Sequence, residues 1–243
     1  RIEKMREAVR ESGAEIDPEA ADFDVLEATK IVNWARKYPS VITLVRQLTG
    51  QPLPIGFIRW EDWEKEWIQN PGFTADLVVP EKMDRNMKWI RARLSEGGSV
   101  SRIVGRSGLG KTRMVLEALR MPEDVKADPE RAALSRLTLS VETEKIGIPE
   151  LTQKVRALVQ TGKRAVVVVD NCEVKLHDKL AAIVSQDGSD VRLLTIDYDE
   201  EQGEGWGERR KITPESQEPI VRQMLEEAPE ADDLSEADLD RVE

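Results

Sequence analysis

Apolar and polar positions follow two alternating patterns along the second half of the chain. Short, nearly unbroken apolar runs rich in β-branched residues predict strands, and apolar residues spaced three or four apart predict helices. We expect strands at 99–104, 135–142, 164–170 and 191–197, and helices at 81–95, 111–120, 149–160, 174–186 and 214–227. Repeated strand–helix units indicate an α/β fold with a parallel sheet covered by helices on both faces.

The first 75 residues show helical spacing, at 24–37, 40–48 and 60–68. In the last of these segments Trp60, Trp63 and Trp67 share one helical face, with acidic residues between them. We interpret this face as one that packs on a neighbouring element. A platform for stacking bases would have Lys and Arg between the aromatic residues. The loops expected to be mobile are 121–134 and 199–210.

Composition narrows the class of protein. The formal net charge is −11, which disfavours sequence-independent binding to nucleic acid. No apolar run is long enough to cross a bilayer, and the single cysteine fits a reducing compartment, so we predict a cytoplasmic protein without membrane contact. The chain starts without Met and stops within a helical pattern, from which we expect a fragment of a longer protein.

The stretch GRSGLGKT between the first predicted strand and the next helix matches G-x-x-x-x-G-K-[ST], the phosphate-loop pattern. Glycines allow a tight turn whose N–H groups point inward, the helix start favours anions, and the lysine reaches the β- and γ-phosphates. A flexible turn is the alternative. The predicted nucleotide-binding residues are Gly105, Arg106, Ser107, Gly108, Leu109, Gly110, Lys111, Thr112 and Arg113.

A magnesium site is expected beside this loop. The apolar run VVVVD ends in Asp170, the position from which an acid holds Mg²⁺ in phosphate-loop proteins, and the Thr112 hydroxyl is the other expected ligand. An aspartate that only caps the next helix is the alternative. The predicted catalytic set is Lys111, Asp170, Asn171 and Glu173.

The ordered set GRSGLGKTRMVLEALR, LTLSVE, KRAVVVVDNCEVKLHDKL and VRLLTIDYD resembles the STAND branch of the AAA+-related P-loop NTPases, in particular bacterial multidomain proteins of antiphage defence. The resemblance covers about residues 76–243. It implies a parallel five-stranded sheet in the order 5-1-4-3-2, flanked by helices and followed by a helical lid. The expected domains are a helical N-terminal segment (1–75), which looks like the tail of an upstream effector module, the P-loop NTPase core (76–213) and the start of the lid (214–243).

Residue 171 bears on hydrolysis. The resemblance implies an acidic residue directly after Asp170, where hydrolysing relatives polarise water, but this chain has Asn171. An amide is a poor proton acceptor, so we predict slow or no hydrolysis, with Glu173 as a candidate substitute. The guanine-recognition motif of GTPases is absent, which favours ATP or ADP. Thr195 resembles the γ-phosphate sensor of AAA+ proteins, with an ordinary strand threonine as the alternative.

The other polar candidates are weaker. Arg106, Arg209 and Arg210 are candidates to approach a nucleotide, with solvated side chains as the alternative, and we expect His177 and Cys172 to be structural. The leading hypothesis is an ATP/ADP-dependent switch with effector and sensor domains on the same polypeptide, which forms a homo-oligomer on activation. An autonomous AAA+-type ATPase acting on DNA or protein and a degenerate structural scaffold are the alternatives.

Overall fold

The computed structural model of the chain describes residues 2–11, 17, 27–49, 57–68, 79–143, 146–198 and 205–213. The chain divides into two compact units, Arg1–Ala35 and Arg36–Glu243. The described helices of the first unit are α1 (Ile2–Glu11) and α2 (Ala28–Ala35). The second unit holds the sheet and every residue predicted for the phosphate loop.

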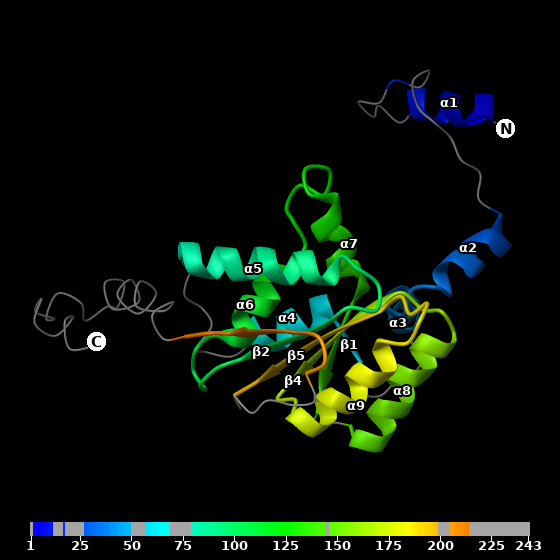
Figure 1. Ribbon diagram of the computed structural model, residues 1–243. Helices are drawn as coiled ribbons and strands as arrows, with labels where there is room; N and C mark the ends of the chain where they lie inside the picture. Colours follow the sequence, from blue (N-terminus) through cyan, green and yellow to red (C-terminus); the bar gives the residue numbers. More distant parts are fainter. Residues whose placement is uncertain are drawn as a thin grey trace, which may run out of the picture. The chain divides into compact units, whose positions relative to one another are not determined.

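A mixed sheet forms the centre of the second unit (Figure 1). Its described strands are β1 (Ile58–Arg59), β2 (Val100–Val104), β3 (Thr138–Glu142), β4 (Ala165–Asp170), β5 (Val191–Asp197) and β6 (Glu208–Lys211). Their order is β1-β3-β4-β5-β2-β6. All neighbours pair in parallel except β1, which pairs antiparallel with β3. The sheet is therefore six-stranded and mixed over these residues, where the sequence predicted five parallel strands.

Helices cover both faces of the sheet (Figure 1). Those of the second unit are α3 (Pro39–Leu48), α4 (Trp60–Ile68), α5 (Glu81–Leu94), α6 (Lys111–Leu119), α7 (Pro129–Leu137), α8 (Ile148–Gln160) and α9 (Val174–Val184). Side chains of β4 alternate between two cores: Val166 and Val168 pack with α4 to α7, and Val167 and Val169 pack with α8 and α9. This double burial explains why the strand is apolar at every position up to its last residue.

The predicted strands and helices of residues 81–197 are confirmed to within a few residues, with one exception. The loop expected at 121–134 contains the start of α7. Asp128 caps this helix, because its Oδ1 accepts the N–H of Arg131 at 3.0 Å, and Pro129 takes the first helical position, where it needs no hydrogen-bond partner. Since α7 runs on to Leu137, β3 begins at Thr138 and not at residue 135.

Part of the predicted N-terminal segment packs on the sheet. Trp60 and Trp63 are each 2% exposed, and the Trp60 indole Nε1 donates to the Leu116 carbonyl at 3.2 Å. The packing face expected from the tryptophan spacing is confirmed for these two residues, whereas the Trp67 side chain lies outside the described residues. The domain boundary near residue 75 stays a prediction, and the expected lid at 214–243 also lies outside the described residues. None of the described helices is long and apolar enough to span a membrane.

Candidate functional site

The loop of residues 105–110 joins β2 to α6 at the carboxyl end of the sheet. Gly105 has a φ of 152°, and a Cβ atom there would lie 2.5 Å from the Ile212 carbonyl oxygen. The chain after β6 is held in this place by the Ile212 N–H, which donates to the Val104 carbonyl at 2.8 Å. A glycine is therefore required at position 105 for space as well as for backbone conformation.

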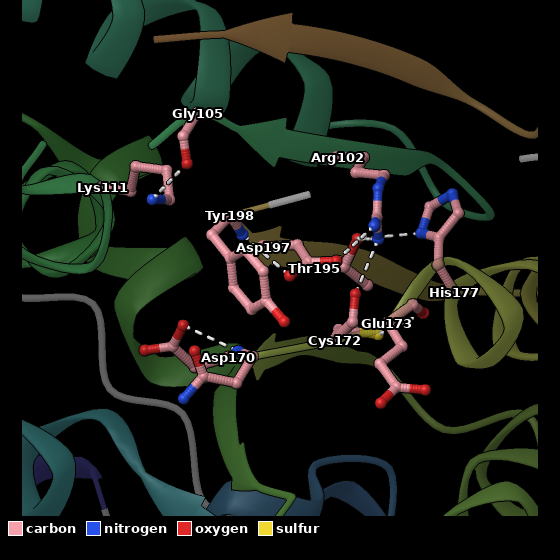
Figure 2. Close-up of polar contacts among 11 residues, drawn as sticks. Arg102, Gly105, Lys111, Asp170, Cys172, Glu173, His177, Thr195, Asp197 and Tyr198 are labelled. Carbon is pink, nitrogen blue, oxygen red and sulfur yellow. Dashed lines mark hydrogen bonds and ion pairs between the residues drawn. The ribbon is translucent and has the colours of Figure 1, made fainter. Parts of the chain in front are cut away.

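Lys111 is the first residue of α6, and its side chain folds back over the loop. It is 8% exposed, and its Nζ donates to the Gly105 carbonyl at 2.7 Å (Figure 2). The same Nζ donates to the Arg106 carbonyl at 2.7 Å. Burial lowers the pKa of Lys111, and the charges of Asp170 and Asp197 oppose this shift. An ammonium carries three donors, so one remains for a ligand in front of the loop.

Asp170, the last residue of β4, meets the loop helix. Its Oδ2 accepts the Thr112 hydroxyl at 2.9 Å across a separation of 58 residues, and its Oδ1 accepts the Asn171 N–H at 2.9 Å. Burial raises the pKa of Asp170, while these two hydrogen bonds and the Lys111 charge oppose the rise. The parallel pairing of the sheet thus gathers the lysine, the threonine and the aspartate at one edge.

These residues face a cavity of about 300 Å³. Its lining consists of Ser107, Gly108, Gly110, Lys111, Thr112, Arg113, Asp170, Asn171, Ile196, Asp197 and Tyr198. Four predicted site residues lie outside this lining. Gly105 and Arg106 supply the carbonyls that bind Lys111, Leu109 packs against the core, and Glu173 is exposed at the start of α9 (Figure 2).

Asn171 takes an unusual backbone conformation at the cavity. It is exposed and has a φ of 50°. Among the described residues that are not glycine, it alone has a positive φ. Asparagine and aspartate enter this left-handed region more readily than most residues. Arg113, which also lines the cavity, forms an ion pair within α6: its Nη2 lies 2.7 Å from Glu117 Oε1.

A buried ion pair, which sequence analysis missed, lies behind the cavity. Arg102 of β2 and Asp197 of β5 are 4% and 3% exposed, and Arg102 Nη2 lies 2.7 Å from Asp197 Oδ2. Arg102 Nη1 also donates to the Cys172 carbonyl at 2.9 Å, and Asp197 Oδ1 accepts the Tyr198 N–H at 2.8 Å (Figure 2). The sequence does contain a signal for this ion pair, the arginine inside the apolar strand SVSRIV, because a buried cation requires a partner.

Thr195 and His177 extend this network. Thr195 is fully buried and does not line the cavity. Its hydroxyl lies 3.4 Å from Arg102 Nη1 and 2.8 Å from His177 Nδ1. His177 Nε2 lies 3.3 Å from the Trp206 carbonyl, which can only accept, so we assign the proton to Nε2. The sensor role predicted for Thr195 is not what the structure favours: it is a satisfied strand threonine.

His177 and Cys172, which were expected to be structural, are both buried. Burial lowers the pKa of His177, the Trp206 carbonyl opposes this shift, and the Arg102 charge adds to it. Burial raises the pKa of the Cys172 thiol to about 12, which makes it unreactive at neutral pH. Within the described ranges, no three His, Cys, Asp or Glu side chains are grouped closely enough to hold a metal ion by themselves.

Comparison with known proteins finds distant structural neighbours. No protein-family model and no curated protein matches the chain. The solved structures that match include C. elegans PCH-2, with 12% identity over 62% of this chain and 48% of that one, and a TM-score of 0.40. An E. coli MS115-1 HORMA:CdnC:Trip13 complex and Rhizobiales Trip13 match at 11% identity, over 74% of this chain and 65% of theirs, with TM-scores of 0.36 and 0.33.

The predicted membership of the STAND branch is wrong on this comparison. The three solved structures named above are of PCH-2, a HORMA:CdnC:Trip13 complex and Trip13, and the chain spans less than two thirds of the length of each matched chain. The setting in a bacterial defence protein, which the sequence analysis inferred from the same resemblance, is not tested by these neighbours and stays a prediction. At these TM-scores the neighbours assign neither a fold nor an activity to this chain.

The first prediction concerns the buried ion pair. Arg102→Met leaves the Asp197 carboxylate buried without its cation, so we expect the free energy of unfolding to fall by about 3–5 kcal/mol. Arg102→Met combined with Asp197→Leu removes both charges and is expected to recover most of that loss. Urea unfolding measures both variants. A cost below about 1 kcal/mol for the single change would contradict this prediction, because it would show that Asp197 is not left as an uncompensated buried charge.

The second prediction concerns pH. The pKa of His177 is lowered in the folded protein, so between that value and 6.5 the unfolded chain binds the proton more readily. Stability from His177 is therefore complete above pH 6.5 and is lost as the pH falls, by at most about 1.4 kcal/mol per unit. Urea unfolding at several pH values measures the slope. His177→Gln keeps an N–H donor near the position of Nε2 without titrating and should flatten the slope; equal slopes would contradict the prediction.

Proposed function

We propose that this chain binds an adenine nucleotide with Mg²⁺ and acts as a nucleotide-dependent switch within a larger protein. The observation that carries the proposal is the gathering of Lys111, Thr112 and Asp170 at one cavity, from two separate strand ends. The loop matches a phosphate-binding pattern, and the cavity is lined by the residues that this pattern requires to face a ligand. Adenine is favoured because the sequence has no guanine-recognition motif.

The strand order supports a P-loop NTPase core. When the strand before the loop is counted as the first, β2, β3, β4, β5 and β6 are strands 1 to 5. Their order in the sheet is then 5-1-4-3-2, with β1 added at the far edge. In such a sheet, ligands bind outside the carboxyl ends of the strands, where the loop and Asp170 lie.

The residues present fit the phosphates and the ion. Gly110 caps α6, and the first residues of this helix line the cavity, so the start of α6 favours an anion there. Lys111 supplies its remaining donor. The Thr112 hydroxyl and the Asp170 carboxylate are the oxygen ligands that Mg²⁺ prefers, and phosphate and water would complete its coordination. When bound, the ion would neutralise phosphate charge.

The hydrogen bonds made by the carboxylates of the cavity favour nucleotide binding over rapid hydrolysis. Among the lining residues, the acids are Asp170 and Asp197. Both oxygens of each are engaged, Asp170 by Thr112 and Asn171, and Asp197 by Arg102 and the Tyr198 N–H. Glu173 lies outside the lining. An autonomous ATPase would need a free base at this place, so it remains the second candidate.

A nucleotide can act as a switch only if its affinity differs between two states of the protein. The loop, Asp170 and Tyr198 are held by different elements, so relative movement of these elements would change how many of them contact the nucleotide. We therefore propose that partner domains on the same polypeptide read the bound nucleotide through this unit. Homo-oligomer formation on activation is part of the same proposal.

The third prediction tests the site. Lys111→Ala removes a charged hydrogen-bond donor, so we expect ADP and ATP affinity to fall at least about tenfold while the fold is kept. Isothermal titration with Mg²⁺–ADP and mass analysis of nucleotide released from the purified protein measure this. Lys179→Ala changes an exposed lysine outside the cavity and serves as the control. Unchanged affinity in Lys111→Ala would overturn the site assignment.

The fourth prediction tests the holding role. With no free carboxylate in the lining, ATP turnover should stay well below about one per second, a common scale for enzymes. Phosphate release from purified protein measures the rate, and the Lys111→Ala protein gives the background from contaminating ATPases. A rate of about one per second or more that is lost in Lys111→Ala would favour the autonomous ATPase.

A further inference from the structure

A second and larger cavity lies at the opposite end of the strands from the phosphate loop. It measures about 710 Å³ and is bounded by α5, α7 and the residues at the amino ends of β4 and β5. Figure 1 shows α5 and α7 on the same face of the sheet, with α6 beside them. Since β2, β4 and β5 are parallel, this cavity lies at the amino ends of the strands and the predicted phosphate loop lies at their carboxyl ends.

Basic side chains dominate the lining of this cavity, which we call the basic cavity, although the whole chain carries a net charge of −11. The lining has three acidic residues and six basic ones: Lys88, Arg91, Arg93, Arg131, Arg164 and Arg192. Four of these cations have ion-pair partners: Lys88 with Asp84, Arg93 with Glu208, and both Arg164 and Arg192 with Asp190. The two that remain are Arg91 of α5 and Arg131 of α7.

Arg91 and Arg131 donate to main-chain carbonyls and, in the part of the chain that the structure describes, form no ion pair. Arg91 Nη1 donates to Ala118 at 3.3 Å, and Arg131 donates to Arg120 at 2.7 Å through Nε and to Glu117 at 3.1 Å through Nη2. These carbonyls end α6, where cations are favourable. Capping uses one donor of Arg91 and two of Arg131, and a guanidinium carries five.

The two guanidinium groups also repel each other. Burial lowers the pKa of Arg91, and the charge of Arg131 lowers it further, while Asp128 and Asp84 oppose the shift. A single arginine could cap these carbonyls without such repulsion. Two adjacent cations with unused donors at the wall of a cavity form an arrangement that an anion between them would stabilise, because a guanidinium fork matches phosphate oxygens.

We propose that the basic cavity is a binding site for a small ligand that carries two or more linked phosphate groups, with Arg91 and Arg131 as its main contacts. The cavity volume is in the range of small-molecule sites. Lys88 lies at the exposed rim, with 67% of its side chain exposed, and adds long-range attraction for the same charge. The site is separate from the phosphate loop and does not depend on the proposed function.

The fifth prediction uses inorganic pyrophosphate as the probe, in a Lys111→Ala background that disables the phosphate loop. Isothermal titration should show binding, and Arg91→Gln with Arg131→Gln should weaken it at least about tenfold, the lower range for a charged hydrogen bond. The matched control is Arg85→Gln with Arg136→Gln, which removes the same charge from exposed positions of α5 and α7 outside the lining. This control should bind as the parent does.

A second pair of variants keeps both arginines and the cap of α6. Ala133 is exposed on α7 and lines the cavity. Ala133→Glu adds a negative charge there and should weaken pyrophosphate binding about tenfold, whereas Ala133→Gln adds the same bulk without charge and should not. If neither the arginine pair nor Ala133→Glu differs from its matched control, the proposal is overturned. Retention of nucleotide by the unmutated protein decides the proposed function independently of this result.

Discussion

The buried ion pair of Arg102 and Asp197 joins β2, which leads into the loop of the candidate site, to β5, whose last residues line the same cavity. Each charge is almost completely removed from water, and such a pair is stable only when its geometry is good and the remaining donors and acceptors are satisfied. Here the partners are the Cys172 carbonyl, just after β4, and the Tyr198 N–H, just after β5. The pair therefore fixes the ends of three neighbouring strands, β2, β4 and β5, relative to one another. Those ends carry the phosphate loop, Asp170 and the rim of the cavity.

The same network reaches the chain that follows β5. Tyr198 is bound through Asp197, and Trp206 is bound through His177 and Thr195. Both ends of the acidic connection between them are thus attached to one set of buried polar groups. Beyond Trp206 the chain enters β6 and then passes Gly105, where the Ile212 carbonyl leaves no space for a side chain. The path of the chain after β5 and the shape of the loop after β2 are therefore coupled by packing.

Periodicity predicted most of the sheet and its helices because the buried elements carry strong patterns. It missed β6, the strand ERRK, because an edge strand with exposed side chains has no apolar repeat. It missed β1, whose two residues are too few for a pattern, and with β1 the mixed character of the sheet. The start of α7 was available in the sequence, since Asp128 followed by Pro129 is a usual helix beginning.

The candidate site divides in the same way. The loop and Asp170 were predicted because each belongs to a local pattern whose residues are close in sequence. Arg102 and Asp197 were not, because their meaning depends on which strands become neighbours, and β2 and β5 are far apart in the chain. Thr195 was placed on the right strand, but its contacts are with Arg102 and His177, which no local pattern shows.

Asn171 shows how backbone and chemistry converge at one position. Its left-handed conformation aims its N–H at Asp170 Oδ1, so it helps to hold the carboxylate that meets Thr112. Asparagine accepts this conformation at small cost, while a longer side chain such as glutamate is less suited to it. The turn that orients Asp170 therefore disfavours the residue best able to activate water at this place. Under the function proposed above, this geometry favours holding a nucleotide over hydrolysing it quickly.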